Sequence, residues 1–229
     1  MKIKSLLFIT YLILFSFNSI SQNKERKFKI HTLAFYNLEN LFDTINDVNK
    51  NDEASPIMEI KFNRSGIYKQ KVANMAKVIS EIGYDVTNRP PSIIGICEVE
   101  NRKVVEDLIS NEKLSKYNYG IVHYDSPDRR GIDVGLLYNK DIFEVVNSSS
   151  HVLYINYNNT SNRSYTRDQL VVSGKLDGEL IHLIVNHWPS RGADETKRMA
   201  AAEVNNTIID SLRKIHNNPK IITMGDFND

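Results

Sequence analysis

Residues 221–228 of the chain read IITMGDFN, and this stretch decides how the rest of the sequence is interpreted. A short apolar run followed directly by acidic and amide side chains is typical of a strand that delivers polar groups to the edge of a sheet. Because side chains alternate along a strand, Asp226 and Asn228 are predicted to share a face. The stretch therefore predicts one wall of a polar site.

Three earlier apolar runs end in the same way. Residues 30–36 are followed by Asn37-Leu38-Glu39-Asn40, residues 92–97 by Glu98-Val99-Glu100-Asn101, and residues 180–185 by Asn186-His187-Trp188-Pro189. The same alternation predicts that Asn37 shares a face with Glu39, and Glu98 with Glu100. The four strand ends together offer carboxylate, amide and imidazole groups.

Helical spacing of apolar residues predicts helices over residues 66–82, 101–109 and 194–215, the last with a buried face that runs from Ala201 to Ile215. Further strands are predicted over residues 119–124, 131–138, 151–155 and 169–176, and a hairpin across Asp177-Gly178 joins the last of these to residues 180–186. The polar segments 43–65 and 156–167 are interpreted as surface loops, and a solvated insertion is favoured over the border of a cleft. Two groups of strands with helices outside them predict a layered α/β sandwich.

Composition bounds the class of protein. With 229 residues, 41% of them hydrophobic, the chain is large enough for one domain with a core that needs no disulfide. A net charge of +1 gives no strong field to attract nucleic acid or anionic membranes, so affinity for phosphate must come from local arginines. Cys97 is the only cysteine and lies in an apolar run, which predicts a packing role.

The first 21 residues have the layout of a secretory signal peptide. Lys2 and Lys4 precede an apolar stretch over residues 6–17, and Ser19-Ile20-Ser21 places small residues before Gln22. The alternative is an uncleaved membrane anchor, but the stretch is shorter than the about 20 residues that span a bilayer. We therefore expect export to a periplasm or the cell exterior, and a mature domain over residues 22–229 without a membrane span.

The strand ends supply the group types that phosphoester cleavage requires. Glu98 offers a carboxylate to a hard cation such as Mg²⁺, Asn37 and His187 suit a metal shell or a phosphoryl oxygen, and Asp226 can orient water. Taken singly, the amides and Asp226 could be turn residues and His187 a packed histidine. A carboxylate directly after five apolar positions is harder to explain without a partner, so the joint pattern favours a site.

Six motifs in order carry a resemblance to a known superfamily. They are residues 36–43 (YNLENLFD), 95–101 (GICEVEN), 130–134 (RGIDV), 166–168 (TRD), 186–191 (NHWPSR) and 225–228 (GDFN). They resemble the motifs of the endonuclease/exonuclease/phosphatase superfamily, to which deoxyribonuclease I belongs. The resemblance implies a four-layer α/β/β/α sandwich of two mainly antiparallel sheets with outer helices. It also implies a phosphoesterase site that uses Mg²⁺, with Mn²⁺ or Ca²⁺ as alternatives.

The resemblance also implies roles for individual residues. Glu98 would be the principal metal ligand, Asn37 would lie beside the metal, and Glu39 would occupy the place of a second acidic ligand. His187 would hydrogen-bond the scissile phosphate, and Asp226 would align or activate the nucleophile. Asn228 and Arg167 would hold phosphate oxygens. A charged turn explains Arg129, Arg130 and Asp133 nearly as well as a functional site does. Arg191 and Arg198 are expected on a solvated loop and a solvated helix face. Glu100 is expected either behind the metal ligands or facing solvent.

In the superfamily, further strands and an Asp-His pair follow the segment equivalent to Gly225-Asp226-Phe227-Asn228, whereas this sequence ends at Asp229. We therefore expect an incomplete domain in which the last strands are missing. Three hypotheses follow: an exported nuclease, a phosphatase or phosphodiesterase acting on lipid or small phosphoesters, and an inactive domain that binds metal or phosphate. Fold alone does not choose among them. The expected partner is a nucleic acid or another phosphoester substrate, and no protein partner is implied.

Overall fold

A computed structural model of the chain describes residues 28–156 and 162–228. The chain divides into two units, Met1–Ile30 and His31–Asp229, and the second contains all of the described helices and strands. The predicted signal peptide, residues 1–21, lies outside the described residues and stays a prediction. In the part of the chain that is described, no helix has the length and apolar character needed to cross a membrane.

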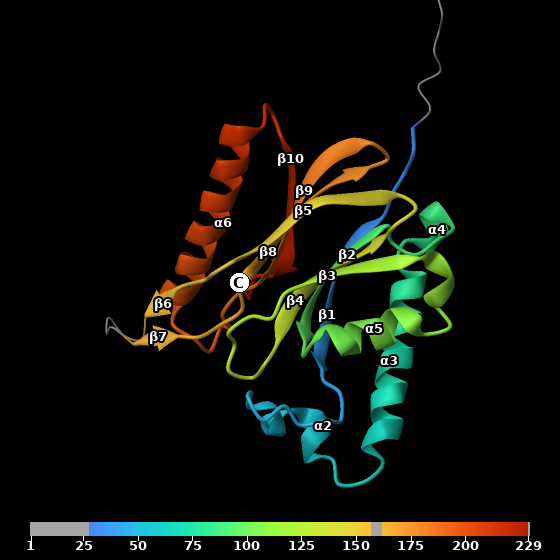
Figure 1. Ribbon diagram of the computed structural model, residues 1–229, viewed down its shortest axis with the longest axis vertical. Coiled ribbons are helices and arrows are strands. Elements are labelled where there is room, and N and C mark those ends of the chain that lie inside the picture. Colours follow the sequence, from blue (N-terminus) through green and yellow to red (C-terminus); the bar gives the residue numbers. More distant parts are fainter. Residues whose placement is uncertain (1–27, 157–161, 229) are drawn as a thin grey trace, which may run out of the picture. The chain divides into compact units, whose positions relative to one another are not determined.

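Two four-stranded sheets form the centre of the fold (Figure 1). The first has the order β1 (Leu33–Leu41), β2 (Ile93–Val99), β4 (Asp133–Asn139), β3 (Tyr119–His123). The second has the order β10 (Lys220–Asp226), β9 (Glu179–His187), β8 (Gln169–Leu176), β5 (Phe143–His151). In each sheet one outer pair is parallel, β1 with β2 and β10 with β9, and the other pairs are antiparallel. The prediction of two mainly antiparallel sheets is confirmed.

The two parallel pairs determine where the site forms. Parallel neighbours need a crossover connection, and here the crossovers contain α3 (Arg64–Glu81) and α6 (Glu195–Ile215). Because the strands of a parallel pair point the same way, their carboxyl ends lie together. Asn37 of β1 is in register with Cys97, the residue before Glu98, and Asp226 of β10 is in register with His187. Each pair thus delivers two of the predicted site residues to one end.

The two sheets pack face to face over an apolar layer. It contains Ile93, Cys97 and Leu136 from the first sheet and Val172, Leu183, Val185 and Met224 from the second. Cys97 is fully buried, and burial raises the pKa of its thiol, with the charges of Glu98 and Asp226 adding to the effect. A buried thiol with a raised pKa is inert, so the packing role predicted for this residue is confirmed.

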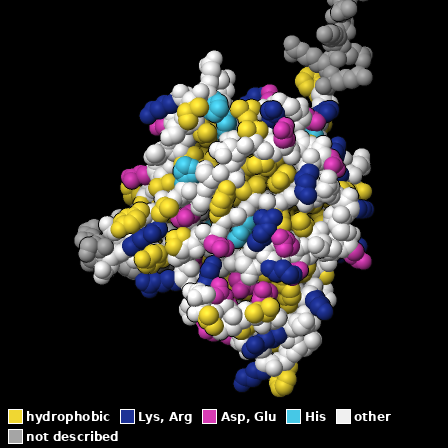
Figure 2. All heavy atoms as spheres, viewed as in Figure 1, with side chains coloured by type: hydrophobic (Ala, Val, Ile, Leu, Met, Phe, Trp, Pro, Cys, Tyr) yellow, Lys and Arg dark blue, Asp and Glu magenta, His cyan; other side chains and the backbone are white. Residues whose placement is uncertain are grey.

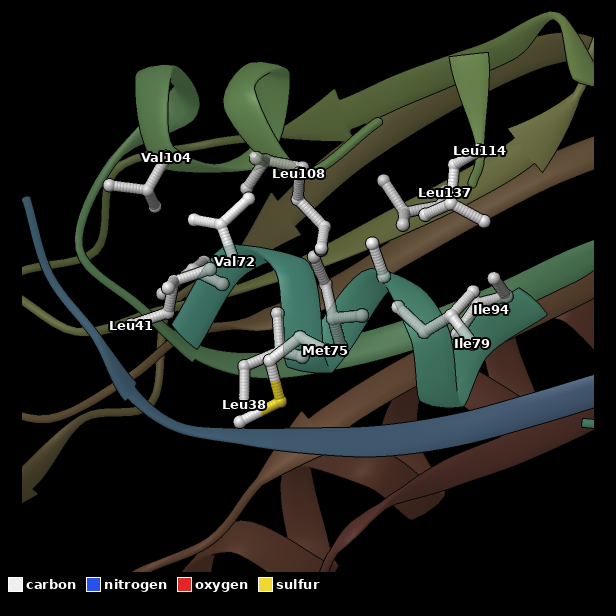
Figure 3. Close-up of a cluster of buried hydrophobic side chains, with 14 of the residues drawn as sticks. Leu38, Leu41, Val72, Met75, Ile79, Ile94, Val104, Leu108, Leu114 and Leu137 are labelled. Carbon is white, nitrogen blue, oxygen red and sulfur yellow. The ribbon is translucent and has the colours of Figure 1, made fainter. Parts of the chain in front are cut away.

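Helices cover the outer face of each sheet. Val72, Met75 and Ile79 of α3 and Leu108 of α5 (Arg102–Ser110) pack on the first sheet (Figure 3). Val204, Ile208 and Leu212 of α6 pack on Val171 and Ile184 of the second. The result is the expected α/β/β/α sandwich. Asn101 begins α5 as predicted, since its side chain accepts a hydrogen bond from the Val104 N–H at 3.1 Å.

Several local expectations were wrong. A strand was predicted over residues 151–155, but the strand in this region is β5, which covers the preceding residues and ends at His151. Its polar run Asn147–Ser150 suits an outer strand and hides the apolar pattern. Ile215, the last residue of α6, is 75% exposed and does not belong to the buried face predicted for this helix. Segment 43–65 is not a solvated insertion: it contains η1 (Asp52–Ala54) and α2 (Pro56–Glu59), and Ile57 packs on Phe42 and Ile132.

The remaining short elements are α4 (Tyr84–Thr87), η2 (Ser115–Tyr117), and the hairpin of β6 (Ile155–Asn156) and β7 (Arg163–Ser164). The predicted turn between β8 and β9 is confirmed, with positive φ angles of 49° at Asp177 and 88° at Gly178. The segment over residues 156–167 was predicted as a loop, but it contains the short strand β7. Residues 157–161 of this segment lie outside the described part.

Candidate metal and phosphate site

Three strand ends meet at one cluster of possible ligands. Glu98 of β2, His187 of β9 and Asp226 of β10 each offer an atom, and these three atoms lie within 4.8 Å of one another. Glu98 and Asp226 are partly exposed, whereas His187 is buried. On the face presented in Figure 2, acidic and basic side chains are interspersed and neither sign of charge dominates. The two sheets therefore both contribute to one polar site.

Asn37 connects the two carboxylates. Its side-chain Nδ2 donates to Glu98 Oε1 and to Asp226 Oδ2, each at 3.1 Å. Its Oδ1 accepts a hydrogen bond from the Glu39 N–H at 2.8 Å, which fixes the orientation of the amide. Hydrogen bonds to ionised carboxylates are stronger than those between neutral groups, so Asn37 holds the two acids at a set separation.

The backbone around Glu98 is unusual. Glu98 has a φ of 60°, and Glu39 and Asn40 on the neighbouring strand have φ values of 51° and 57°. The left-handed region is costly for residues other than glycine, by about 1–3 kcal/mol each. The benefit is visible, because the Asn40 N–H turns toward Glu98 and donates to its Oε2 at 2.9 Å. Strain of this kind gathers at functional sites.

This conformation overturns the prediction that Asn37 and Glu39 share a face. Between Asn37 and Leu41 the register with β2 shifts, so the simple alternation is lost. The Glu39 side chain is exposed, and Glu39 is absent from the ligand group formed by the described residues. Lys71 of α3 holds the turn by donating to the carbonyl oxygens of both Glu39 and Asn40.

Glu100 does not face solvent. It is 4% exposed, and its Oε2 accepts a hydrogen bond from the Asp43 N–H at 2.7 Å. Burial raises the pKa of this carboxyl to about 7, with the negative charges of Asp43 and Asp52 adding to the effect. The alternation predicted for Glu98 and Glu100 is interrupted by the left-handed conformation at Glu98 and by a register shift against β4.

His187 is a neutral group in a cationic setting. It is 5% exposed, and its Nε2 lies 3.6 Å from Glu98 Oε1. Burial, together with the positive charges of Arg167 and Arg130, lowers the pKa of the imidazole to about 3. Its Nδ1 is buried without a hydrogen-bond partner in the described structure. A buried polar atom without a partner costs free energy, which points to a ligand or water that satisfies it.

The segment after β10 is tied to the segment after β9. The Asn228 N–H donates to Asp226 Oδ1 at 3.1 Å, and Asn228 Nδ2 donates to the Trp188 carbonyl oxygen at 3.0 Å. The Trp188 N–H in turn donates to the Asp226 carbonyl oxygen at 2.9 Å. The rings of Trp188 and Phe227 pack edge to face at 4.8 Å. The structure therefore brings Asn228 to the site through Trp188.

Arg167 reaches the same point from the loop before β8. Its Nη2 donates to the Trp188 carbonyl oxygen at 2.5 Å and its Nη1 to Asp128 Oδ2 at 3.2 Å. Asp128 is buried, and its other oxygen, Oδ1, lies 3.4 Å from Arg130 Nε in a second ion pair. Arg167 is 6% exposed, and no described residue accepts a hydrogen bond from its Nε. A guanidinium fixed in this way places a permanent positive charge beside the site, which favours a phosphate.

Sequence reasoning missed three contributors. Asp128 stands just before Arg129 and Arg130, in a run that a charged turn explains from sequence, and only its ion pairs reveal its role. Trp188 acts through its backbone, which no side-chain motif can indicate. Lys71 lies on a helix that is otherwise read as packing, and nothing in its spacing distinguishes it.

The second cluster of histidine and acids is structural. Asp133 is fully buried, its Oδ1 accepts from both the N–H and the hydroxyl of Ser126 at 2.7 Å, and His123 Nε2 lies 3.1 Å from its Oδ2. These contacts engage both carboxylate oxygens of Asp133. Asp133 therefore anchors the loop that carries Asp128. Arg198 is partly buried rather than fully solvated, and its Nη1 donates to the carbonyl oxygens of Ser190 and Ala193.

The donor set at the first cluster fits a divalent cation. Glu98 and Asp226 supply carboxylate oxygens, which hard cations prefer, and His187 supplies a nitrogen that remains neutral above its pKa of about 3. His187 contributes to this donor set through Nε2, which lies 3.6 Å from Glu98 Oε1. Mixed oxygen and nitrogen donors do not select one metal.

Comparison with known proteins gives the family. The family described as Endonuclease/Exonuclease/phosphatase family matches residues 32–229 of the sequence. The chain belongs to the endonuclease/exonuclease/phosphatase family. Members of this family are phosphoester hydrolases and generally use a divalent metal. The superfamily resemblance and the fold expected from it are thereby confirmed.

Solved structures share the family fold at low sequence identity. TDP2 from Caenorhabditis elegans matches with a TM-score of 0.53 and 18% identity over 72% of this chain and 43% of that one. ANGEL2, described as a 2',3'-cyclic phosphatase, matches with a TM-score of 0.58 and 13% identity, over 87% of this chain and 53% of that one. A mannosyl-6-phosphatase from Bacteroides thetaiotaomicron matches with a TM-score of 0.55 and 17% identity, over 87% of this chain and 66% of that one. The chain thus spans about half to two thirds of these proteins, and a search of curated proteins found no match.

Proposed function

We propose that this chain is an exported phosphoester hydrolase that depends on a divalent cation, with Mg²⁺ as the first choice and nucleic-acid phosphodiesters as the first substrate class. One observation carries the proposal. Ligand atoms of Glu98, His187 and Asp226, from three strands of two sheets, lie within 4.8 Å of one another. Family membership supports the reaction class.

Within this cluster we assign Glu98 to the cation as its principal ligand, with Asn37 beside it, and we assign His187 and Asp226 to the phosphate and the water. Glu98 is held from two sides by Asn37 and by the Asn40 N–H, so its carboxylate is oriented before anything binds. When bound, a divalent cation neutralises phosphate charge and makes water more acidic. Glu39 is left out of the assignment because its side chain is exposed and lies outside the ligand group.

The remaining residues act on the phosphate and the water. His187 stays neutral above its pKa of about 3 and can donate a hydrogen bond to a phosphoryl oxygen. Arg167 contributes its free Nε and a positive charge. Asp226 is placed to orient the attacking water and to receive its proton. Asn228 and Arg167 both donate to the Trp188 carbonyl oxygen, which sets them on the same side of the site.

The decisive experiment measures hydrolysis of plasmid DNA and of bis-p-nitrophenyl phosphate by the wild type and by Glu98→Gln, each with Mg²⁺ or with EDTA. We expect turnover only with the cation and a loss of about 10²-fold or more in Glu98→Gln. Glu144→Gln is the matched control, since this glutamate is exposed on β5 and its side chain is 72% accessible. Equal rates for all three proteins with and without the cation would remove the proposal.

A lipid or small phosphoester is the second candidate substrate. The near-neutral charge of +1 favours it over a tight binder of duplex DNA, whose affinity depends on many phosphate contacts. Two of the similar structures are described as phosphatases, one of them acting on a mannosyl phosphate. Turnover of nucleic acid, a lipid phosphodiester and mannose 6-phosphate under one set of conditions separates the candidates by their relative kcat/KM.

The third candidate is a binding domain without turnover. The chain spans only part of the similar structures, so their activities are proposals here. Trp188 is the single tryptophan and packs beside the site, which makes its fluorescence a direct readout of ligand binding. A response of Trp188 to Mg²⁺ or phosphate with no hydrolysis of any substrate supports this candidate.

Export and the mature domain over residues 22–229 are part of the proposal. They are tested by expressing the full chain and measuring the intact mass of the protein recovered outside the cytoplasm. Cleavage after Ser21 is the expected result, and recovery of the full-length chain from the cytoplasm contradicts it.

A further inference from the structure

A second feature lies directly beside the phosphate site. A pocket of ≈ 680 Å³ opens between the loop that contains Lys50, the loop that contains Asp128 and Arg129, and Tyr165. Asp128 lines this pocket and also accepts a hydrogen bond from Arg167, so Asp128 connects the pocket to the phosphate site. Its volume lies in the range of sites that hold small organic ligands, roughly 300–1,000 Å³.

The aromatic wall of this pocket is fixed in place. Tyr165 is 46% exposed, and the Arg163 guanidinium lies over its ring, 4.9 Å from the ring centre. The same guanidinium lies 5.2 Å from the ring of Tyr154, so Arg163 is shared by two tyrosines. Arg163 Nε and Nη2 are buried without a hydrogen-bond partner among the residues described. Arg163 is therefore held over the rings of two tyrosines and covers one face of Tyr165.

The charge of the pocket is positive although the protein is near neutral. Lys50 and Arg129 line it, and Asp128 is the single acid among its described lining residues. The Asp128 carboxylate already pairs with Arg130 and Arg167. The Lys50 side chain lies over Gly131, where a Cβ would come within 2.6 Å of Lys50 Cδ, so the glycine makes room for it. An anionic ligand is favoured here.

We propose that this pocket binds a nucleobase next to the scissile phosphate, stacked on Tyr165, with Lys50 and Arg129 at the neighbouring phosphates. The proposal rests on the proposed function and narrows its substrate class to single-stranded nucleic acid. Base faces are accessible only when the strand is unpaired, and aromatic rings beside cations are the usual platform for them. A lipid tail would instead need an apolar wall, and a sugar monophosphate has no second phosphate for Lys50 and Arg129.

The test compares two labelled oligonucleotides of equal length by fluorescence anisotropy, in EDTA so that no turnover occurs. One carries normal bases and the other has abasic sites at every position, which keeps the phosphates and removes the stacking. We expect the wild type to bind the base-bearing strand more tightly. Tyr165→Ala should weaken that complex about 5- to 100-fold and leave the abasic complex within about 2-fold. Tyr165→Phe should keep the preference.

Two further variants sharpen the comparison. Lys50→Gln should weaken both complexes alike and lower the slope of log K against log salt by about 1, because it removes a phosphate contact. Tyr84→Ala is the matched control, since Tyr84 is 45% exposed on α4 and does not line this pocket. Thermal melting of each variant verifies that it is folded, and the comparison of the two strands on the wild type keeps the proposal testable if Tyr165→Ala does not fold.

Equal affinity of the wild type for both strands, or an equal loss on both with Tyr165→Ala, overturns the proposal. Displacement of the base-bearing strand by mannose 6-phosphate at matched concentration also overturns it. These outcomes are distinct from failure of the proposed function, which is read from turnover by the wild type and Glu98→Gln. Base preference without turnover retains the pocket and removes the hydrolase, and turnover without base preference does the reverse.

Discussion

The side chain of Asn37 donates a hydrogen bond to Asp226 at 3.1 Å, across 189 positions of sequence and from one sheet to the other. The same Nδ2 donates to Glu98 at an equal distance. Two carboxylates that would repel each other are thus separated by one amide. This arrangement explains how the site holds two acids together before a cation arrives.

The first prediction follows from this amide. Asn37→Asp replaces a double donor with a third carboxylate, so the protein should be less stable in EDTA by about 2–4 kcal/mol. Mg²⁺ should then raise the melting temperature of Asn37→Asp by more than it raises that of the wild type, because the cation relieves the repulsion. Differential scanning fluorimetry measures both. An identical Mg²⁺ shift in the two proteins contradicts a cation at this cluster.

Arg167 should not tolerate lysine. Its guanidinium donates to Asp128 and to the Trp188 carbonyl oxygen and still has Nε free. A lysine ammonium cannot reproduce this planar set of donors, so Arg167→Lys should lose about 10- to 100-fold in kcat/KM although the charge is kept. Arg213→Lys on the exposed end of α6 serves as the control, because its side chain is 66% accessible. Full activity of Arg167→Lys would show that charge alone is sufficient.

A buried amide on α6 should influence the site from a distance. Asn205 is 5% exposed, and its Nδ2 donates to Thr223 Oγ1 at 3.1 Å and to Asn186 Oδ1 at 3.3 Å, on the strands that carry Asp226 and His187. Asn205→Ala should cost about 1–3 kcal/mol in urea unfolding and lower kcat. Asn206→Ala, on the exposed face next to it, should stay within about 0.5 kcal/mol. Equal effects of the two changes would contradict the role of the network.

Gly225 should be irreplaceable because of close backbone approach. A Cβ at this position would lie 2.3 Å from the carbonyl oxygen of Asn186 on β9. Gly225→Ala should therefore force β10 away from β9 and destabilise the protein by more than about 2 kcal/mol. Gly192→Ala is the control, since the nearest atom to its added Cβ is Ser190 Oγ at 3.8 Å. Chemical denaturation compares them, and an unchanged midpoint for Gly225→Ala refutes the close approach.

Glu100 makes stability depend on pH. Its pKa is raised from 4.5 to about 7 in the fold, so between these values the folded state binds more protons than the unfolded state. The free energy of unfolding should thus fall as pH rises from about 4.5 to 7 and stay low above it. Glu100→Gln mimics the protonated form and removes this dependence.

The measurement for Glu100 is urea unfolding in EDTA at pH 5 and pH 8. Glu100→Gln should be near the wild type at pH 5 and more stable by about 1–3 kcal/mol at pH 8. Glu106→Gln, whose glutamate is 47% accessible on α5, should show no such difference. If Glu100→Gln gains the same stability at both pH values, the carboxyl does not change its protonation in this window.

Much of the fold could be predicted because its signals are local. Helical spacing found α3 and α6, Asn101 marked the start of α5, and Asp177-Gly178 marked the hairpin of β8 and β9. The polar strand ends predicted which groups would meet, and the structure brings Asn37, Glu98, His187 and Asp226 together. The outer strand β5 was misplaced because polar residues there remove the alternation on which the prediction depends.

The sequence by itself determined the set of strands and the chemical types at their ends, since apolar periodicity and turn chemistry act over a few residues. Only the tertiary structure decided which of those groups face one another. Lys71 holds Glu39 and Asn40 in a left-handed turn, so Glu39 faces solvent and the Asn40 N–H points at Glu98. Asp128 fixes Arg167 in the same way. These placements depend on contacts between residues far apart in the chain, and such contacts override the local preference of the backbone.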